Sequence, residues 1–548
     1  MNGGQIIAQV LRNHGVQHLF TLCGGHIAPI YVEAEKDGIR VTDVRDEASA
    51  VFAADAIARL TGIPGVVAVT AGPGVTNSIT ALKNAQMAQS PILLLGGATA
   101  TLLRNRGALQ DIDQMALVRP HVKWAGRVKR LREIAPALNK AMRLARSGVP
   151  GPVFVELPVD LLYDEETVRE WYGKKNTAGA SPAEKAIQWY INRHVNGLFK
   201  GMEDYAIPGP EEPQVPAFTQ TQVRTVVREL KNAQRPVVVI SSGAMMEAEG
   251  ARTLGAAVKR LGIPAYLSGM ARGLAGHISA VQYRHKRKNA LREADCILLC
   301  GVPVDFRLDY GSHLSRRART IAVNRSREEL KKNIRPHRAI LADPGAFLIA
   351  LSGEADAFPG WSEWKHQLQE REDAREAEIR QTAETPIEGI NPVALFLRME
   401  ALIPGHSVLI ADGGDFAATA AYTLRPRRPL AWLDPGVFGT LGVGGGFALG
   451  AALRYPDDYI WIIYGDGSAA YSLMEMDTFR KYGMKVCGII GNNGSWEQIA
   501  RDQVTLLGTD TATGLPRSDY HRVAEAFGGA GERVERLGDF EGALQRAM

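Results

Sequence analysis

The sequence predicts an α/β fold with three doubly wound domains, each built on a parallel β-sheet that helices cover on both faces. Three observations predict it. Short apolar runs recur along the 548 residues and alternate with segments of helical pattern. Apolar runs between helices are typical of parallel strands that are buried on both sides. The alternation is interrupted twice, and a chain of this length is long enough for three domains of ordinary size.

The first domain is expected to span residues 1–164. Its clearest strands are predicted at 65–70, 91–95 and 152–156, and a helical pattern lies at 75–88. These short runs are rich in Val, Ile and Leu, as strands in the middle of a parallel sheet are.

The same pattern returns in a middle domain at 219–353 and in a third domain at 389–548. Each has apolar runs of strand length followed by helical segments. The predicted strands are 236–241, 296–300, 320–323, 407–411, 459–464 and 485–490.

Two joints separate the three domains. Residues 165–218 include Pro208, Pro210 and Pro213 among acidic residues and are interpreted as a linker or insertion, with one short amphipathic helix near 183–199. Residues 354–388 are a second joint. Their 362–384 stretch is dense in Glu, Arg and Gln, which indicates an exposed helical connector.

The composition argues against several classes of function. A formal charge of +5 without a long basic run does not indicate nucleic-acid binding. No uncharged apolar stretch reaches the roughly 18 residues of a membrane helix, and the N-terminus lacks the pattern of a secretion signal. Four scattered cysteines without metal-site spacing favour a reduced, cytoplasmic protein.

Polar residues follow two predicted strands of the third domain. Gly465-Asp466-Gly467-Ser468 comes after 459–464, and Asn492-Asn493-Gly494-Ser495 comes after 485–490. Ligands of open α/β sheets bind at these carboxyl ends of strands, where glycines and helix N-termini can approach a phosphate. Asp466 and Asn493 offer the oxygen ligands that Mg²⁺ prefers. A Gly-Asp-Gly sequence alone more often forms only a turn, but an Asn pair ending 27 residues after the Asp is far more specific.

An acidic residue opens a helical pattern in the first domain. Glu47 follows a strand-like run at 41–44, and Val69-Thr70-Ala71-Gly72-Pro73-Gly74 comes shortly afterwards. Taken alone, Glu47 is more simply explained as a residue that complements the helix dipole. A third glycine-rich segment, Phe438 to Phe447, is equally compatible with close packing of a helix on a sheet.

Together these motifs resemble the acetolactate synthase superfamily of thiamine-diphosphate enzymes over essentially the whole chain. The resemblance implies a pyrimidine-binding domain, a middle domain and a diphosphate-binding domain, in that order. It implies that Asp466 and Asn493 bind Mg²⁺ with their side chains and Ser495 with its main-chain oxygen. Glu47 would hydrogen-bond the pyrimidine ring of the cofactor, a role that needs a carboxyl group shielded from water.

The resemblance implies further contacts with the cofactor. Leu441 would wedge beneath it and hold it in a bent shape, and the backbone of Gly439 would accept a hydrogen bond from its amine. The remaining cofactor-binding positions implied are Gly72, Asn77, Gly413, Gly414, Asp415, Gly465, Gly467 and Ser468.

A narrower resemblance is to acetolactate-synthase-like 2-hydroxyacyl-CoA lyases. It is carried by the stretches 21–27, 83–91, 105–110 and 432–436, and by the 165–218 insertion. It implies cleavage of a 2-hydroxyacyl-CoA to formyl-CoA and an aldehyde, reversible as a ligation. Two alternatives stay open: an acetolactate-synthase-like carboligase or 2-oxoacid decarboxylase, and a non-catalytic regulatory homologue.

Departures from acetolactate synthases surround the expected substrate pocket. Leu109 replaces the usual Phe before Gln110, and Glu497 follows the Asn pair in a different context. Glu497 is the candidate acid/base, although it could be a surface residue of the next helix. Gln110 and His26 are candidate contacts to the reacting intermediate, although a lone His after two glycines is often only a loop residue.

The middle domain is a candidate site for the ADP part of CoA, for a separate ADP or FAD, or for neither. Its candidate phosphate contacts are Arg272, Arg284, Lys286 and Arg307, although the basic run 284–288 could equally be a solvated helix face. Relatives pair the first and third domains of different subunits, so the resemblance implies a homodimer or homotetramer. They also continue beyond a helix like 541–548 into a final strand and tail.

Overall fold

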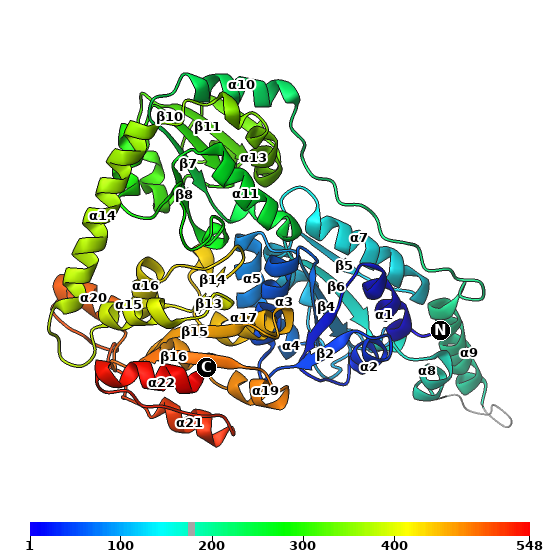
Figure 1. The fold of residues 1–548 in the computed structure, drawn as a ribbon. Coiled ribbons are helices and arrows are strands. Elements are labelled where there is room, and N and C mark those ends of the chain that lie inside the picture. The colour runs from blue at the N-terminus through cyan, green and yellow to red at the C-terminus, as the bar shows by residue number, and fades with distance from the viewer. Residues whose placement is uncertain (174–180) are drawn as a thin grey trace. The chain divides into compact units, whose positions relative to one another are not determined.

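The computed structural model describes residues 1–173 and 181–548, and three parallel sheets organise them (Figure 1). The part of the 165–218 insertion that falls on 174–180 lies outside the described residues. Two compact units form: Met1–Ala58 with Ile63–Gln214, and Arg59–Gly62 with Val215–Met548. The first unit holds one sheet and the second holds two, so the expected α/β fold with three parallel sheets is confirmed.

The sheet of the first unit has the order β2-β1-β3-β4-β6-β5, and its neighbours pair in parallel. Its central strands β3, β4 and β6 are buried along their whole length, as the apolar runs predicted. The strands are β1 His18–Thr21, β2 Arg40–Asp43, β3 Gly65–Val69, β4 Ile92–Ala98, β5 Trp124–Arg127 and β6 Val153–Pro158.

The helical pattern predicted at 75–88 is two helices rather than one. They meet at Ser78, whose hydroxyl donates to the Gly74 carbonyl oxygen at 2.8 Å, a back-bond of the kind that bends helices. The helices of this unit outside the insertion are α1 Gly3–Asn13, α2 Ala28–Lys36, α3 Glu47–Thr61, α4 Pro73–Asn77, α5 Ile79–Ala88, α6 Gln114–Val118 and α7 Ile134–Arg146.

The described part of the insertion, 165–173 and 181–218, contains two helices. The helix expected near 183–199 is α9 (Pro182–Phe199), which begins with a capping box formed by Ser181 and Glu184. A second helix, α8 (Glu165–Trp171), was not expected, and it packs against α9. Val195, Leu198 and Phe199 of α9 join the hydrophobic core of the first unit, so the insertion is folded onto that core.

The middle sheet has the order β12-β11-β10-β7-β8-β9, and the third has β14-β13-β15-β16. Their neighbours also pair in parallel. The strands are β7 Pro236–Ile240, β8 Ala265–Leu267, β9 Gln282–Tyr283, β10 Cys296–Cys300, β11 Arg319–Asn324, β12 Arg338–Leu341, β13 Ser407–Ala411, β14 Trp432–Leu433, β15 Tyr459–Gly465 and β16 Val486–Gly491.

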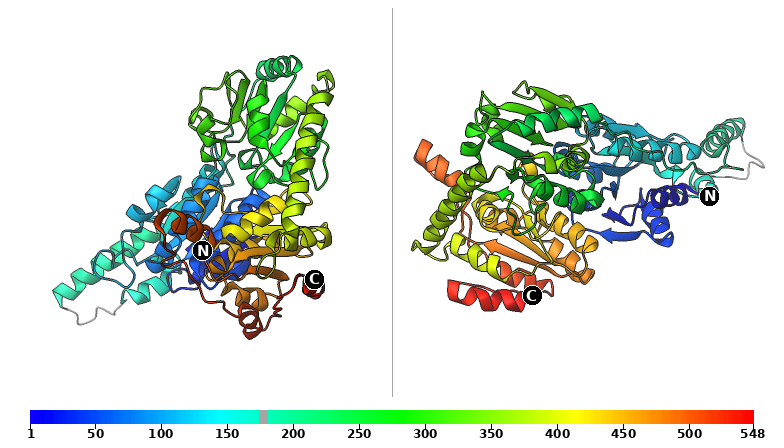
Figure 2. Two further views of the ribbon diagram at one scale, coloured as in Figure 1. Left: turned by 90° about the vertical axis from the view of Figure 1, so that its left-hand side faces the viewer. Right: turned by 45° about the horizontal axis from the view of Figure 1, so that its top comes forward.

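Helix α14 (Ser362–Glu384) is the connector predicted at 362–384, and both views of Figure 2 show it as one long helix. It contacts β9 of the middle sheet and α15 beside the third sheet. The other helices of this unit are α10 Gln220–Lys231, α11 Ala251–Leu261, α12 Arg287–Glu293, α13 Pro344–Ser352, α15 Pro392–Leu402, α16 Gly414–Thr423, α17 Val443–Arg454, α18 Asp466–Ala469, α19 Glu475–Lys481, α20 Glu497–Leu507, α21 Tyr520–Ala526 and α22 Phe540–Ala547.

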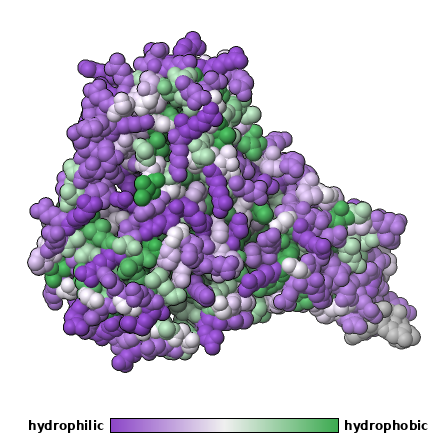
Figure 3. All heavy atoms as spheres, viewed as in Figure 1, coloured by the Kyte–Doolittle hydropathy of each residue, from purple (hydrophilic) through white to green (hydrophobic). Residues whose placement is uncertain are grey.

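The face of the protein drawn in Figure 3 is mainly hydrophilic, and its hydrophobic residues lie in small separate groups. Among the helices in the described part of the chain, none combines the length and the apolar character needed to cross a bilayer.

Candidate active site

The parallel pairing of β15 with β16 brings the two polar turns of the third domain together. Gly465 and Gly491 are register partners at the carboxyl ends of these strands. Asp466 follows the first strand, and its Oδ2 accepts the backbone N–H of Gly494 at 2.7 Å. Asn493, whose side chain is exposed, is therefore held beside the buried carboxylate of Asp466.

The turn around Asp466 is closely packed. A Cβ on Gly467 would lie 2.4 Å from the Trp496 ring, so only glycine fits there. The Gly467 N–H donates to Asp466 Oδ1 at 2.9 Å, and Ser468 Oγ donates to the Gly465 carbonyl oxygen at 3.0 Å. These contacts fix the start of α18, where backbone N–H groups and glycines suit the approach of a diphosphate.

The loop after β16 is fixed by its hydrogen bonds. Trp496 N–H donates to the Thr513 carbonyl oxygen, and Leu515 N–H donates to that of Gly494, each at 2.8 Å. Asn493 Oδ1 accepts from the Ser495 N–H at 3.2 Å. A carboxylate, an amide oxygen and a main-chain carbonyl oxygen at this place form a donor set that fits Mg²⁺.

Glu497 begins α20 and is exposed. Asn493 Nδ2 donates to its Oε2 at 3.5 Å, so the candidate acid/base lies beside the candidate metal ligand, as its position in the sequence predicted.

The Leu441 side chain lies against Gly413. A Cβ on Gly413 would be 2.3 Å from Leu441 Cδ2, so this glycine lets the leucine reach the end of β13. Gly439 has a φ of 65°, a left-handed conformation that glycine adopts readily. Gly414 and Asp415 open α16, where Asp415 forms an ion pair with Arg501. The predicted wedge and the predicted loop are therefore in contact.

Asp412, which the motifs did not single out, holds this region together. It directly follows β13 and is completely buried. Its carboxylate accepts the Gly442 N–H at 2.9 Å and the Gly444 N–H at 2.7 Å. Burial raises the pKa of Asp412 to about 7, and the two backbone donors oppose that rise. Because Gly442 follows Leu441, Asp412 fixes the backbone next to the wedge.

Glu47 in the first unit is a buried carboxyl group with an amide partner. It is 6% exposed at the start of α3. Asn77, at the end of α4, donates to its Oε2 at 3.0 Å. Two residues that the sequence assigned separately to the cofactor are therefore in contact, and Glu47 has the shielded environment that the role implied by the resemblance requires.

Gln110 and His26 meet at Thr70. His26 Nδ1 lies 3.3 Å from Thr70 Oγ1, which donates to Gln110 Oε1 at 3.4 Å. Burial lowers the pKa of His26, and a hydrogen bond with Gln110 opposes this effect. Gln110 has a φ of 62°, a left-handed conformation that is uncommon for a side-chain-bearing residue and is often found at functional sites.

Gly72 lies directly beneath Gln110, and a Cβ on it would be 3.0 Å from the Gln110 Cβ. Its N–H donates at 2.9 Å to Gln114, which in turn donates to the Gly97 carbonyl oxygen at 3.0 Å. Thr70 and Gln114 were not predicted as site residues. Their roles depend on contacts across the carboxyl edge of the sheet, which no local motif reveals.

The candidate CoA cations of the middle domain have partners within the chain. The Arg272 guanidinium lies 4.4 Å from the centre of the Trp432 ring and donates to the Ala421 carbonyl oxygen. Arg307 pairs with both oxygens of Asp305 at 3.0 and 2.8 Å. Lys286 lies 3.7 Å from Glu378.

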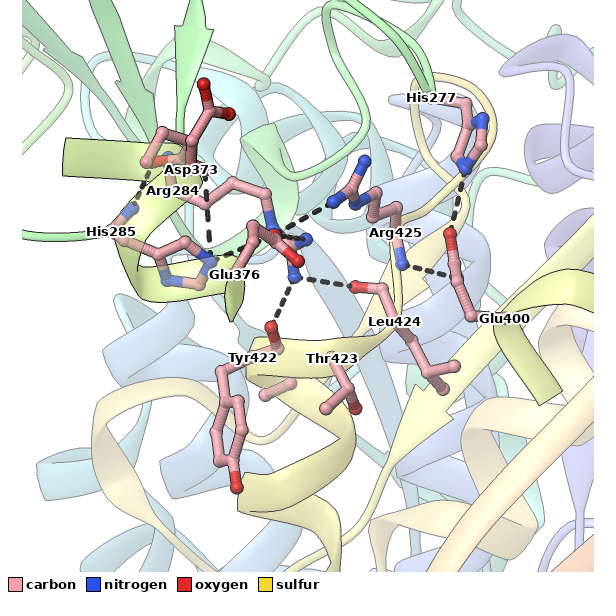
Figure 4. A network of polar contacts seen from close by, with 12 residues as sticks. His277, Arg284, His285, Asp373, Glu376, Glu400, Tyr422, Thr423, Leu424 and Arg425 are labelled. Atoms are coloured by element: carbon pink, nitrogen blue, oxygen red, sulfur yellow. Dashed lines mark hydrogen bonds and ion pairs between the residues drawn. The ribbon is translucent and has the colours of Figure 1, made fainter. Parts of the chain in front are cut away.

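Arg284 contributes to a polar network that joins α14 to the end of α16 (Figure 4). It donates to the carbonyl oxygens of Tyr422 at 2.5 Å and Leu424 at 3.5 Å, and it pairs with Glu376 at 3.4 Å. Glu376 also pairs with Arg425 at 2.8 Å. Arg284 therefore contributes to the packing of these helices, a contact that the basic run 284–288 did not reveal.

Comparison with known proteins agrees with this geometry. Residues 1–117 match the N-terminal TPP binding domain of thiamine pyrophosphate enzymes, 223–351 match their central domain and 412–548 match their C-terminal TPP binding domain. TPP, thiamine pyrophosphate, is thiamine diphosphate.

Similar proteins cover almost the whole chain. It is 48% identical to 2-hydroxyacyl-CoA lyase 2 of Danio rerio over 98% of its length and 87% of that protein. It is 47% identical to 2-hydroxyacyl-CoA lyase 2 of Homo sapiens over 98% of its length and 85% of that protein. A probable acetolactate synthase of Mycobacterium bovis is 32% identical over the whole chain and 94% of that protein. With its three matching domains and the buried Glu47 and Asp466 at the expected strand and helix ends, the chain belongs to the thiamine pyrophosphate enzyme family.

Proposed function

We propose that this protein is a thiamine-diphosphate-dependent lyase that cleaves a 2-hydroxyacyl-CoA to formyl-CoA and an aldehyde. The observation that carries the proposal is the difference in similarity. Relatives named 2-hydroxyacyl-CoA lyase 2 are 45–49% identical over nearly the whole chain, whereas the acetolactate synthases are 32% identical. In the reaction, the bond between the acyl carbon and the 2-hydroxy carbon breaks. The hydroxyl proton leaves, and the acyl carbon gains a proton to give formyl-CoA.

The chain offers a partner for each end of the cofactor. Asp466, Asn493 and the main-chain oxygen of Ser495 would hold Mg²⁺ and, through it, the diphosphate. Glu47 would share a proton with a ring nitrogen of the pyrimidine, and Asn77 would hold the Glu47 carboxyl group in place. When bound, the cofactor supplies a carbon nucleophile that adds to a carbonyl group and stabilises the negative charge that develops there.

Proton transfer to and from the substrate is assigned to residues around this cofactor. Glu497 would accept the 2-hydroxyl proton, because it is the carboxylate beside Asn493. Gln110 would donate a hydrogen bond to the substrate oxygen through its amide. Since burial lowers the pKa of His26, its imidazole would be neutral near pH 7 and would act as a hydrogen-bond partner.

The middle domain is proposed to hold the ADP part of CoA or a separate ADP or FAD. The exposed Lys286 is the most accessible of the four cations for a phosphate, because the Arg272 and Arg284 side chains bind carbonyl oxygens of the chain. A flavin absorbance in the purified protein would identify FAD, and release of ADP on denaturation would identify ADP.

The active form is proposed to be a homodimer or a homotetramer. The two ends of the cofactor would then be bound by Glu47 of one subunit and Asp466 of another, which is a common arrangement for sites at symmetric interfaces. Light scattering of the purified protein measures the number of subunits.

The test is product analysis with purified protein, thiamine diphosphate and Mg²⁺. A 2-hydroxyacyl-CoA is expected to give an aldehyde and formyl-CoA in equal amounts, and pyruvate is expected to give no acetolactate. Formation of acetolactate from pyruvate, without aldehyde from the CoA ester, would show that the protein is a carboligase and not the proposed lyase. Failure to speed exchange of the cofactor C2 proton in deuterated water would indicate a non-catalytic homologue.

A further inference from the structure

A cavity of about 260 Å³ opens at the carboxyl edge of the sheet in the first unit. Ala71 and Gln110 line one part of it, and His194 and Leu198 of α9 line another. Ala71 lies between Thr70 and Gly72, so the cavity borders the cluster that contains the candidate contacts Gln110 and His26. The insertion thus contributes a wall to a cavity next to the candidate active site, a role that its sequence did not indicate.

Helix α9 is tied to the sheet by a chain of hydrogen bonds. Thr101 Oγ1 donates to Asp160 Oδ2. The hydroxyl oxygen of Thr101 therefore accepts from His194 Nε2, which lies 2.7 Å from it. Tyr172, just after α8, also donates to Asp160 Oδ2 at 2.7 Å. Both helices of the insertion are therefore fixed to the end of β6 through the fully buried Asp160. A wall fixed in this way can define the size of a ligand.

The size of the cavity excludes a whole CoA ester. Cavities that enclose drug-sized ligands measure roughly 300–1,000 Å³, so 260 Å³ accommodates a smaller organic group. Much of the lining is apolar: Ala71, Ala98, Ile112, Val128, Pro158 and Leu198.

The charges around the cavity nearly balance, which argues against an anionic occupant. Arg127 pairs with Glu156 in the wall. Arg104 and Lys129 also line the cavity, and Asp111 offsets one of these two cations. Burial lowers the pKa of His194, with Asp160 opposing, so its imidazole adds no charge near pH 7. A neutral, largely apolar group suits this lining better than a phosphate does.

We propose that this cavity binds the side chain of the 2-hydroxyacyl group, the part that leaves as the aldehyde, and that α9 sets its permitted length. This inference rests on the proposed function and deepens it. The reacting carbons would lie at the Gln110 end, and the side chain would extend toward Leu198. The CoA part would lie outside the cavity. His194 and Leu198 would determine specificity and would take no part in the chemistry.

The test changes the size of the cavity at two places. Leu198→Ala enlarges it, and Leu198→Phe shortens it. Because Leu198 also packs in the core, the same pair is made at Ile112, which is 45% exposed and lines the cavity from another segment. Lys185→Ala, on an exposed part of α9, is the matched control. The substrates are 2-hydroxybutanoyl-, 2-hydroxyhexanoyl- and 2-hydroxyoctanoyl-CoA.

The alanine variants are expected to raise kcat/KM for the longest ester relative to the shortest by about 10-fold or more, because each methylene that fits or clashes changes the rate constant by roughly 10- to 200-fold. The phenylalanine variants are expected to shift the ratio the other way, and Lys185→Ala is expected to leave it unchanged. His194→Ala is expected to broaden the length profile, and His194→Gln, which keeps a side-chain N–H, is expected to restore it.

Calorimetric binding of butanamide, hexanamide and octanamide to the holoenzyme provides a readout that needs no turnover. If the wild type cleaves the esters but the size variants keep its length profile, the cavity assignment is overturned and the proposed function stands. If the wild type cleaves none of them while amide binding follows the size of residues 198 and 112, the cavity binds short aliphatic groups, but the proposed function fails and its assignment to a 2-hydroxyacyl side chain fails with it.

Discussion

Asp412 and Asp466 occupy equivalent places in the third sheet, yet the structure uses them differently. Each directly follows one of two adjacent parallel strands, β13 and β15, and each carboxylate accepts two backbone N–H groups. Both donors to Asp412 come from the buried Gly442–Gly444 segment. One donor to Asp466 comes from Gly494, next to the exposed Asn493. The end of a strand therefore places a carboxylate, but an accessible second oxygen ligand beside it makes a candidate metal site.

The largest effect is expected from Asp466→Ala, which tests whether Asp466 binds the metal while Asp412 only holds the backbone. It removes a proposed Mg²⁺ ligand and the acceptor of two N–H groups, so activity is expected to fall at least about 1,000-fold, as when a group that acts in the transition state is lost. Calorimetry is expected to show weak or no binding of thiamine diphosphate with Mg²⁺. Asp457→Ala, an exposed aspartate just before the same strand, is the control. If the Asp466 variant binds the cofactor normally, Asp466 is not a ligand of the metal.

Glu47→Gln extends the comparison to a buried carboxyl group whose proposed role is proton transfer. The amide preserves the shape but cannot exchange a proton, so C2-proton exchange of the bound cofactor is expected to slow by about 100-fold or more. Cofactor affinity is expected to change much less. Asn77→Ala, which removes only the amide partner of Glu47, is expected to have a smaller effect. Equal rates for wild type and Glu47→Gln would exclude this residue from activation.

Mixing the two inactive variants tests whether the carboxylates of one site come from different subunits. In a dimer with one Glu47→Gln and one Asp466→Ala subunit, one of the two shared sites keeps both native residues. Random mixing is therefore expected to restore about a quarter of the wild-type activity. If both residues of a site came from one subunit, the mixture would stay inactive. Different affinity tags on the two variants, both retained after two successive affinity steps, confirm that mixed dimers have formed.

Much of the fold follows from sequence because central strands of a parallel sheet are continuous apolar runs. Strands such as β3, β10 and β13 were predicted within one or two residues for this reason. The edge strands β5 and β14 were not predicted. β5 is only partly buried, and β14 is two residues long, so neither forms an apolar run that could be distinguished from a loop.

The candidate site divides in the same way. Asp466, Asn493 and Glu47 belong to local motifs, so the sequence alone was enough to propose them as candidates. Asp412 accepts a hydrogen bond from Gly442, 30 residues away, and Arg272 stacks on Trp432. These partners become known only from the fold. Local patterns therefore reveal residues prepared for a ligand, whereas residues that hold the site together depend on tertiary contacts.

A smaller effect is expected from Asp412→Asn, measured as stability against pH. The folded state holds the pKa of Asp412 at about 7, above its ordinary value of 3.8. Folding therefore favours the protonated form, and stability is lost as the pH rises from about 4 to 7, by at most about 1.4 kcal/mol per pH unit. Asn carries no charge, so the variant is expected to lack this loss. Parallel curves of denaturation midpoint against pH would contradict the assignment.

The smallest effect on stability and cofactor binding is expected from Glu376→Gln, in the network of Figure 4. Glu376 is distant from the glycine-rich turns in sequence, and in the described structure it contacts none of them. The hydrogen bond from His285, with Arg425 and Arg284 nearby, lowers the pKa of Glu376 to about 2 against burial, which raises it. Its contribution to stability is complete above the ordinary pKa of 4.5 and is lost as the pH falls toward 2. Urea unfolding at pH 7 is expected to show a loss of about 1 kcal/mol, a modest value because solvent screens the network, and the difference from wild type is expected to shrink with acid. Unchanged cofactor binding would show that Glu376, unlike Asp466, contributes only to stability. A loss of cofactor binding would contradict this and would show that the packing of α14 affects the glycine-rich turns.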